Sequence, residues 1–135
     1  YFMISFTDLF GMQRAKLVPA AAIAEMERDG AGFAGFATWL DMTPAHPDMF
    51  AMPDASAVIQ LPWKKEVAWV AADCVMEDSH VAQAPRVILK KLQKRAADKG
   101  LYMKTGVECE YFLLNADGTR ISDGLDVESK PCDDQ

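Results

Sequence analysis

The start of the chain predicts a β-hairpin that leads directly into a helix. The stretch FMISFTDLFGMQRAKLV holds two β-prone runs, and the TDLFG between them carries Asp8 and Gly11, which supply turn chemistry. Pro19 then begins an alanine-rich run, PAAAIAEMERDG, because proline is tolerated in the first helical turn, and Gly30 stands where a helix would end. This beginning favours a small sheet with the helix packed on it.

Two further strands complete this first unit. The runs SAVIQL and EVAWVAA are predicted strands, separated by PWKK at residues 62–65. The order strand, strand, helix, strand, strand describes an α+β unit in which one helix covers one face of a sheet. We therefore expect a β-grasp, ubiquitin-like domain over residues 1–82.

The segment between the helix and the later strands lacks a clean helical or strand period. Residues 32–53, GFAGFATWLDMTPAHPDMFAMP, are rich in glycine, alanine, proline and aromatic residues. They predict a long structured loop. Long ordered loops in compact domains commonly carry function, so this one is a candidate binding segment.

A second helix is predicted over residues 85–100. PRVILKKLQKRAADKG begins with Pro85 and ends with Gly100, and its apolar residues recur with a helical period on one side: Ile88, Leu89, Leu92 and Ala96. It also carries a large share of the fourteen basic residues of the chain, namely Arg86, Lys90, Lys91, Lys94, Arg95 and Lys99. This basic side is either a solvated face or an interface.

The stretch GVECEYFLL, residues 106–114, places two glutamates inside an otherwise apolar predicted strand. Alternate side chains of a strand share a face, so Glu108 and Glu110 would lie side by side, about 6 to 7 Å apart. Like charges at that distance are costly unless water or cations compensate them. The pattern indicates a strand that meets positive charge.

The end of the chain predicts little regular structure. A turn is expected at NADGT, residues 115–119, and the DGLDVESKPCDDQ beyond it is acidic and irregular. Residues 83–135 hold one predicted helix and one predicted strand, too little apolar surface to close a core. We expect an incomplete second domain there, which continues elsewhere or packs on the first unit or on another chain. The chain begins directly on a strand-like run, YFMISF, and we therefore expect it to be a trimmed fragment.

Composition excludes several kinds of partner. The net charge of −6 argues against a nucleic-acid partner, which requires a basic protein face, and no apolar run approaches the roughly 20 residues of a membrane span.

The two histidines, His46 and His80, stand alone in the sequence and are expected to be exposed loop residues. The cysteines have no disulfide or zinc-ligand spacing, which favours a reducing, cytoplasmic setting; they are Cys74, Cys109 and Cys132.

A series of stretches along most of the chain resembles a known family. In order they are FTDLFGMQRAKLVP, GFAGFATW, PDMFAMPDASAV, the PW before Lys64, AADCVMED, APRVILKKL and GVECEYFLL. This series is similar to the N-terminal part of the glutamine synthetase family of ligases. The resemblance implies a β-grasp domain followed by the first helix and strand of the catalytic domain, with the boundary between residues 82 and 83.

The resemblance also implies a chemistry. The family's Glu-x-Glu motif falls on Glu108 and Glu110, each of which contributes to one of two neighbouring Mg²⁺ or Mn²⁺ ions, and hard cations prefer such oxygen ligands. The implied reaction uses ATP to activate glutamate as γ-glutamyl phosphate, which an amine converts to an amide. The implied assembly is a homo-oligomer, commonly a dodecamer of two stacked hexamers, in which sites lie between subunits. These 135 residues alone are then expected to be inactive.

One departure from the family pattern concerns the amine. Ammonia-using members commonly read FDGSS where this chain reads FAGFA, so Ala34 replaces an aspartate and Phe36 a serine. Apolar lining favours an amine with a methyl or larger group, and we expect Phe33, Ala34 and Phe36 to line the amine site. The loop is similar to the type III branch, which includes γ-glutamylmethylamide synthetases. Methylamine is therefore favoured over ammonia. Alternatively, Ala34 and Phe36 are core residues and a carboxylate elsewhere handles ammonium.

Further residues match the family with less specific roles. Asp48 matches an aspartate near the intersubunit site, where it is a candidate catalytic residue, although a turn or capping role suits its position equally. Arg86 is expected to be structural and to pair with a carboxylate near the domain junction. Trp39 and Trp63 are expected to pack in a core or an interface.

A competing hypothesis is that the chain is a non-catalytic β-grasp interaction module. Such a module has no reason to keep the costly pair of carboxylates, Glu108 and Glu110.

Overall fold

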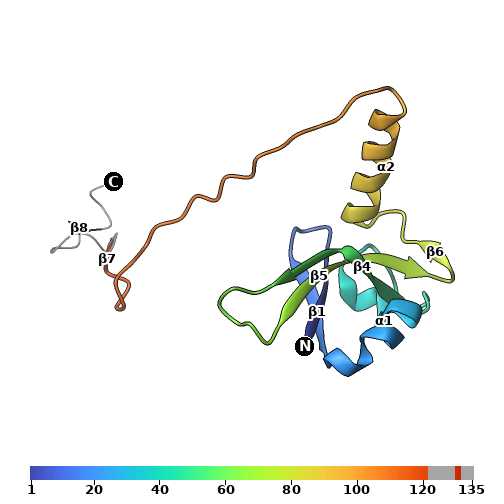
Figure 1. Ribbon diagram of the computed structural model, residues 1–135, viewed down its shortest axis with the longest axis horizontal. Helices are drawn as coiled ribbons and strands as arrows, with labels where there is room; N and C mark the ends of the chain where they lie inside the picture. Colours follow the sequence, from blue (N-terminus) through green and yellow to red (C-terminus); the bar gives the residue numbers. More distant parts are fainter. Residues whose placement is uncertain (122–129, 132–135) are drawn as a thin grey trace. The chain divides into compact units, whose positions relative to one another are not determined.

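The computed structural model describes residues 1–121 and 130–131, and the chain divides into two compact units, Tyr1–Met103 and Lys104–Gln135. The first unit is built on a mixed sheet (Figure 1). The strands are β1 (Phe2–Thr7), β2 (Gln13–Val18), β3 (Ala31–Phe33), β4 (Met49–Gln60), β5 (Ala68–Met76) and β6 (Ser79–His80).

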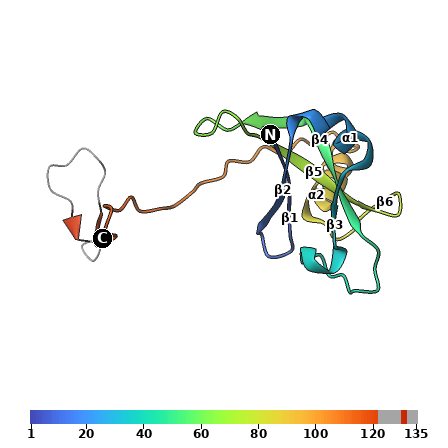
Figure 2. The ribbon, with the colours of Figure 1, turned by 90° about the horizontal axis from the view of Figure 1, so that it is seen from below.

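The sheet has the strand order β2-β1-β5-β4-β3, with β6 paired to β5. The central pair, β1 and β5, is parallel and aligns Ile4 with Val70, whereas every other pair in this sheet is antiparallel. Figure 2 shows β1 and β2 on one side of the sheet and β3 on the other. This topology confirms the α+β class and the predicted β-grasp domain.

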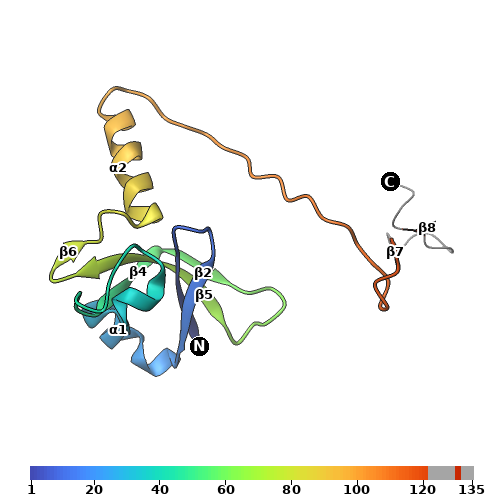
Figure 3. The same ribbon diagram turned by 180° about the vertical axis from the view of Figure 1, so that it is seen from behind.

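Helices lie against both faces of the sheet. The 3-10 turn η1 (Ala20–Ala22) leads into α1 (Ile23–Asp29), which packs mainly on β4, and a second 3-10 turn, η2 (Gly35–Thr38), follows β3. Helix α2 (Pro85–Ala97) lies against β1 and β5 on the other side (Figures 1 and 3). The predicted first helix and second helix are thus both present, with their ends within a few residues of those expected.

The core lies between the sheet and α1. Alternate residues of β1 and β5 point into it, as the two-residue period of a strand requires. Burial, together with the charge of Asp73, raises the pKa of the Cys74 thiol to about 12, so this cysteine packs as a neutral apolar group. The cluster comprises Ile4, Phe6, Val18, Ala31, Leu40, Met49, Ala51, Val70, Ala72 and Cys74, joined by Val81, Ala84 and Val87 at the start of α2.

Gly30 ends α1 for two reasons. Its φ of 77° lies in the left-handed region, and a Cβ there would stand 2.6 Å from the Met52 sulfur. A side chain at residue 30 would therefore both strain the backbone and collide with β4. The predicted helix end is confirmed.

The predicted loop over residues 32–53 is only partly correct. The segment contains the end of β3, the turn η2 and the first five residues of β4, which begins at Met49 and not near Ser56. Pro53 favoured a loop interpretation because proline disrupts a central ladder. Here the register of β4 against β5 shifts between Pro53 and Val58, and that irregularity accommodates the proline.

The apolar side of α2 is largely exposed within the described residues. Val87 is buried against the sheet, but Ile88, Leu89 and Leu92 are 42%, 45% and 56% exposed. Leu89 and Leu92 line a hollow of about 570 Å³ together with residues 101–103. The helix is therefore fixed to this unit by its first turns, and its later turns leave an apolar stripe uncovered.

The second unit corrects the prediction of a strand over residues 106–114. The backbone there is extended (Figure 1), but it forms no ladder apart from a single bridge at Leu114. An extended segment becomes a strand only when a neighbouring strand satisfies its N–H and C=O groups, and the described chain offers none. The turn predicted at residues 115–119 is confirmed. It is closed by a hydrogen bond from Gly118 N to Asn115 O at 3.0 Å.

The rest of the second unit is short. The strands β7 (Arg120–Ile121) and β8 (Lys130–Pro131) pair in antiparallel fashion. The expectation of an irregular acidic end at residues 123–135, and Cys132 with it, falls almost entirely outside the described residues. Among the helices that the structure describes, none has the length and apolar character required to cross a membrane.

Replacement of a central core residue tests this architecture. Ile4 is 0% exposed on β1, so Ile4→Ala should lower the free energy of unfolding by about 2 to 5 kcal/mol, because it removes buried methyl groups and leaves a cavity. Ile59→Ala on β4 is the matched control, since Ile59 is 56% exposed. Urea unfolding followed by circular dichroism would measure both. Equal losses in the two variants would contradict the assigned core.

Candidate functional site

Two side chains contact Phe33 at the end of β3, one from β1 and one from β2. Its ring meets the Phe6 ring edge to face, with centroids 5.1 Å apart and an interplanar angle of 87°. The Lys16 ammonium lies over the Phe33 ring, 4.8 Å from its centroid, and also donates a hydrogen bond to the Gly32 carbonyl. Phe33 is partly buried, so it joins the core to the loop that follows it.

The loop after Phe33 is anchored from within. Thr38 is buried, and its hydroxyl donates to the Gly35 carbonyl at 2.6 Å. Gly35 lies close to its neighbours, since a Cβ there would stand 2.8 Å from the Met42 sulfur and 3.0 Å from the Pro47 carbonyl oxygen. Leu40 is fully buried, and its carbonyl accepts a hydrogen bond from the Gln83 amide at 2.8 Å.

Ala34 and Phe36 lie on the outside of this anchored loop. Ala34 is exposed and Phe36 is 54% exposed, so neither is a core residue of this unit. Asp48 is also exposed, just before β4 begins. Two apolar side chains, Ala34 and Phe36, and the Asp48 carboxylate are therefore accessible on this side of the described unit.

The turn between β1 and β2 is organised around the buried carboxylate of Asp8. The Asp8 carboxylate is 1% exposed; one oxygen accepts the N–H groups of Phe10 and Met12, both at 2.9 Å. The other oxygen accepts the Arg14 guanidinium at 2.8 Å. Burial would raise the pKa of Asp8, but the hydrogen bonds from Met12, Arg14 and Phe10 together hold this pKa below its ordinary value. Turn chemistry at Asp8 is confirmed.

Trp39 is a residue whose environment the sequence does not reveal. Trp39 is 57% exposed and Trp63 is 80% exposed. The expectation that these two tryptophans pack in a core is therefore wrong for this unit. Their role in an interface stays a prediction. The Trp39 carbonyl accepts a hydrogen bond from Leu9 N at 3.2 Å, and its ring meets the Phe10 ring with centroids 5.5 Å apart. The aromatic pair Phe10 and Trp39 lies 29 positions apart in the chain, so no local period could have indicated it.

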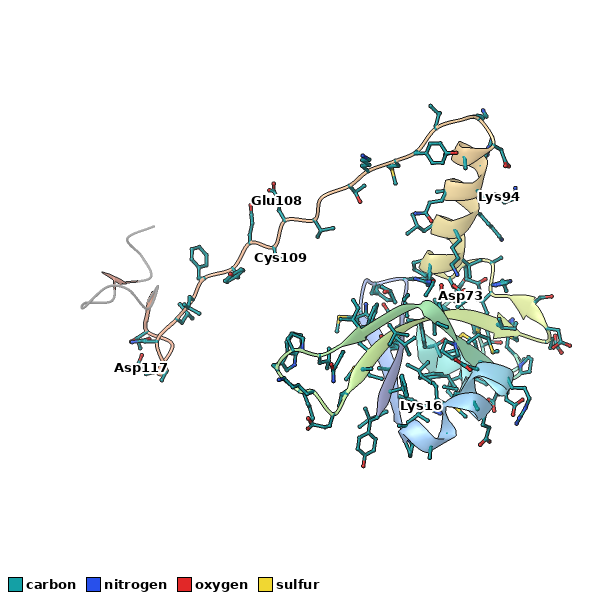
Figure 4. The ribbon with its side chains drawn as sticks, viewed as in Figure 1. Lys16, Asp73, Lys94, Glu108, Cys109 and Asp117 are labelled. Carbon is teal, nitrogen blue, oxygen red and sulfur yellow. The ribbon has the colours of Figure 1, made fainter. Side chains whose placement is uncertain are left out.

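Glu108 and Glu110 lie in the second unit, on the extended segment. Both are exposed, and Figure 4 shows Glu108 and the neighbouring Cys109 on opposite sides of the trace. These two neighbouring side chains therefore alternate, as they do in an extended backbone. Two carboxylates supply hard oxygen ligands but not the full set that Mg²⁺ requires. Within the described residues, no group of three or more His, Cys, Asp or Glu side chains is close enough to hold a metal ion. The pair fits a contribution to a larger site.

A charged cluster fixes the start of α2 to the sheet. Arg86 Nε lies 3.0 Å from Asp73 Oδ1 and its other nitrogen contacts Asp54, while Lys90 bridges the same two aspartates. Figure 4 shows Asp73 on β5 beneath the start of α2. The prediction that Arg86 pairs with a carboxylate is confirmed, and Arg86 and Lys90 therefore have structural roles. The side-chain hydroxyl and backbone N–H of Ser56, with Lys90, hold the pKa of Asp54 well below its usual range.

The chain is similar to known proteins along its length. It is 73% identical over 135 residues to "Glutamine synthetase" of Rhizobium leguminosarum bv. phaseoli, covering all of this chain and 31% of that protein. It is 37% identical to "Glutamate--methylamine ligase" of Methyloversatilis universalis, covering 99% of this chain and 31% of that protein. A solved structure, "GmaS/ADP complex-Conformation 1", is 59% identical with a TM-score of 0.83 and covers 99% of this chain and 31% of its own. No family model matches the chain.

Along its whole length, this chain matches the N-terminal part of glutamine synthetase family members. Its residues span 31% of the Rhizobium leguminosarum protein and 31% of a second relative, "Glutamine synthetase" of Rhizobium meliloti, to which the chain is 72% identical. A more distant structure, described as a novel glutamine synthase homolog, has a TM-score of 0.61 at 19% identity and shares the fold. The glutamine synthetase resemblance expected from the sequence motifs is confirmed.

The cluster around Asp54 predicts a dependence of stability on pH. An aspartate with a depressed pKa stabilises the folded state above its ordinary pKa near 4, and this contribution is lost as the pH falls through the depressed value. The wild-type protein should therefore lose stability on acidification below about pH 5 more steeply than Asp54→Asn. Urea midpoints measured from pH 6 to pH 2 would compare the slopes.

Ser56→Ala provides a graded control for this prediction. It removes the hydroxyl that donates to Asp54 at 2.6 Å but leaves Arg86 and Lys90 in place. Its slope should lie between those of the wild type and Asp54→Asn. Identical slopes in all three proteins would show that Asp54 has the same pKa in the folded and unfolded states.

Proposed function

We propose that this chain forms the β-grasp part of an ATP-dependent ligase that joins glutamate to a small amine, and that this amine is methylamine. The observation that carries the proposal is the exposed loop that bears Ala34 and Phe36. Position 34 has no carboxylate, and both side chains are accessible. Similarity to a glutamate–methylamine ligase and to GmaS structures supports it.

The proposed reaction has two steps. First, an oxygen of the glutamate side-chain carboxylate attacks the γ-phosphorus of ATP, the bond from that phosphorus to the bridging oxygen breaks, and ADP leaves. The amine nitrogen then attacks the activated carbonyl carbon, phosphate departs, and the nitrogen loses a proton. The protein must orient the carboxylate, exclude water from the activated acyl group and accept that proton.

The described loop is suited to the amine step. Phe33, Ala34 and Phe36 would contact the methyl group, because an apolar lining costs nothing when it desolvates a methyl but penalises a fully hydrated ammonium ion. Asp48 is the proposed acceptor of the amine proton, since a carboxylate stabilises the positive charge that nitrogen carries before deprotonation. Phe33 contacts Phe6 and Lys16, and these contacts would restrain its ring in the proposed lining.

Glu108 and Glu110 are the proposed metal ligands. They would hold Mg²⁺ or Mn²⁺ together with ligands from outside the described residues, and a bound divalent ion would neutralise charge on the phosphoryl oxygens. The exposed position of both carboxylates on an extended segment agrees with a role in a site completed by other parts of the enzyme. In this proposal the full enzyme is a cytoplasmic homo-oligomer, a dodecamer of two stacked hexamers, and these 135 residues alone are inactive.

Ammonia is the second candidate substrate. Two relatives at 73% and 72% identity bear the name "Glutamine synthetase", which favours ammonia as the nitrogen donor. Because residue 34 is an alanine, a carboxylate at another position would then receive the proton of the ammonium ion, and Asp48 is the candidate. The two possibilities differ in whether the apolar loop selects the amine.

Phosphate release by the full-length protein decides between these substrates. With ATP, Mg²⁺ and glutamate present, we expect a higher kcat/KM for methylamine than for ammonia at matched concentrations of free amine. Preference for ammonia would assign a glutamine synthetase. No phosphate release with ammonia, methylamine or a larger primary amine would refute a ligase and support a β-grasp interaction module.

The same assay tests the amine-binding loop. Ala34→Asp should raise the ratio of kcat/KM for ammonia to that for methylamine about tenfold, because a carboxylate favours the smaller, more strongly hydrated cation. Ala37→Asp is the matched control, since Ala37 is also exposed and lies on the same loop. An unchanged ratio in Ala34→Asp, or an equal change in Ala37→Asp, would show that position 34 does not select the amine.

A glutamate substitution tests the metal assignment. Glu110→Ala in the full-length protein should reduce amide formation by at least about 100-fold while the oligomer still assembles, because it removes a ligand and no core packing. Glu27→Ala, which removes an exposed glutamate of α1, should leave the activity unchanged. Wild-type activity of Glu110→Ala at ordinary Mg²⁺ concentration would contradict the assignment.

A further inference from the structure

The turn between β1 and β2 is built to a fixed shape, although the proposed reaction uses none of its residues. The buried Asp8 carboxylate accepts two backbone N–H groups and the Arg14 guanidinium, at 2.8 to 2.9 Å. Backbone hydrogen bonds from Asp8 N to Met12 O and from Gly11 N to Asp8 O close the turn. Gly11 supplies the left-handed conformation that the turn needs, with a φ of 81°. These hydrogen bonds together restrain the turn to this conformation.

This rigid turn holds Trp39 from outside the loop. Leu9 N donates to the Trp39 carbonyl at 3.2 Å, and the Phe10 ring meets the Trp39 ring at 84°, with centroids 5.5 Å apart. An edge-to-face pair fixes the orientation of both rings as well as their separation. The backbone and the side chain of Trp39 are therefore held by two successive residues of the turn.

Trp39 needs such support because its backbone is in an unfavourable conformation. Its φ and ψ of 55° and 40° are left-handed, which is uncommon for a residue other than glycine and rare for a bulky one. A conformation of this kind persists only where surrounding contacts hold it. Trp39 directly follows η2, so its position determines where the loop that carries Ala34 and Phe36 ends.

We propose that the Asp8–Met12 turn is a positioning element for the amine-binding loop: by holding Trp39, it keeps Ala34 and Phe36 in the place where the amine binds. Phe10 is the positioning residue that makes the ring contact. This inference rests on the proposed function. Loss of the Phe10 ring allows Trp39 to leave its left-handed conformation and displaces the loop, which weakens amine binding without a direct effect on ATP or glutamate.

Steady-state kinetics of the full-length protein test the proposal. Phe10→Ala should raise the KM for the amine about tenfold and leave kcat and the KM for ATP within about twofold, because small displacements of a binding group cost this much or more. Phe10→Tyr keeps the ring and should restore the wild-type KM. Leu17→Ala is the matched control, since it removes an exposed apolar side chain from the opposite end of the same hairpin.

Hydrogen–deuterium exchange provides a measurement that needs no activity. The amides of residues 34–41 should exchange faster in Phe10→Ala than in the wild type, and at the wild-type rate in Phe10→Tyr and Leu17→Ala. If the protein has no ligase activity with any amine, the proposed function fails, and exchange alone then decides whether the turn holds the loop. Unchanged exchange in Phe10→Ala would overturn the positioning role. Faster exchange with an unchanged amine KM would overturn the link between the loop position and amine binding.

Discussion

The parallel pairing of β1 with β5 is the contact on which the rest of the first unit depends. It aligns Ile4 with Val70 at the middle of the sheet, and both side chains are almost completely buried. Each of these strands carries a further antiparallel neighbour, so loss of the pair would separate the β1–β2 hairpin from β3, β4 and β5. The face of the sheet towards α1 carries most of the buried apolar cluster, and burial of apolar surface is the dominant favourable contribution to folding. The opposite face is fixed to α2 by the charged cluster and by the buried Val87.

The elements with strong local signals could be predicted from the sequence. The hairpin carries its own turn residues, Asp8 and Gly11, and the two helices carry proline at or near their starts and glycine near their ends. The early part of β4 could not be predicted, because Pro53 is compatible with a strand only through a register shift that depends on β5. The strand predicted around Glu108 had the correct alternation, but pairing depends on a neighbour, which no local pattern supplies.

The candidate site was predictable only in part, because local motifs indicate residues but not the contacts between distant segments. The family motifs pointed to Ala34, Phe36, Asp48 and the glutamate pair, and the described loop leaves the first three accessible. Support for that loop comes from contacts between segments far apart in the chain: Leu9 and Phe10 with Trp39, and Gln83 with Leu40. Such contacts follow from the sheet topology, so they become visible only after the strands have been placed.

The edges of the sheet have a consequence for self-association. Exposed, apolar strand edges recruit other extended chains, and this protein contains an extended segment whose Val107 and Tyr111 are 88% and 79% exposed. One edge strand, β2, carries the charged Arg14 and Lys16, while the other, β3, has only three residues. Charges and short length both oppose the addition of a further strand. The edges of the β-grasp unit should therefore resist edge-to-edge aggregation, for example while the chain is being synthesised.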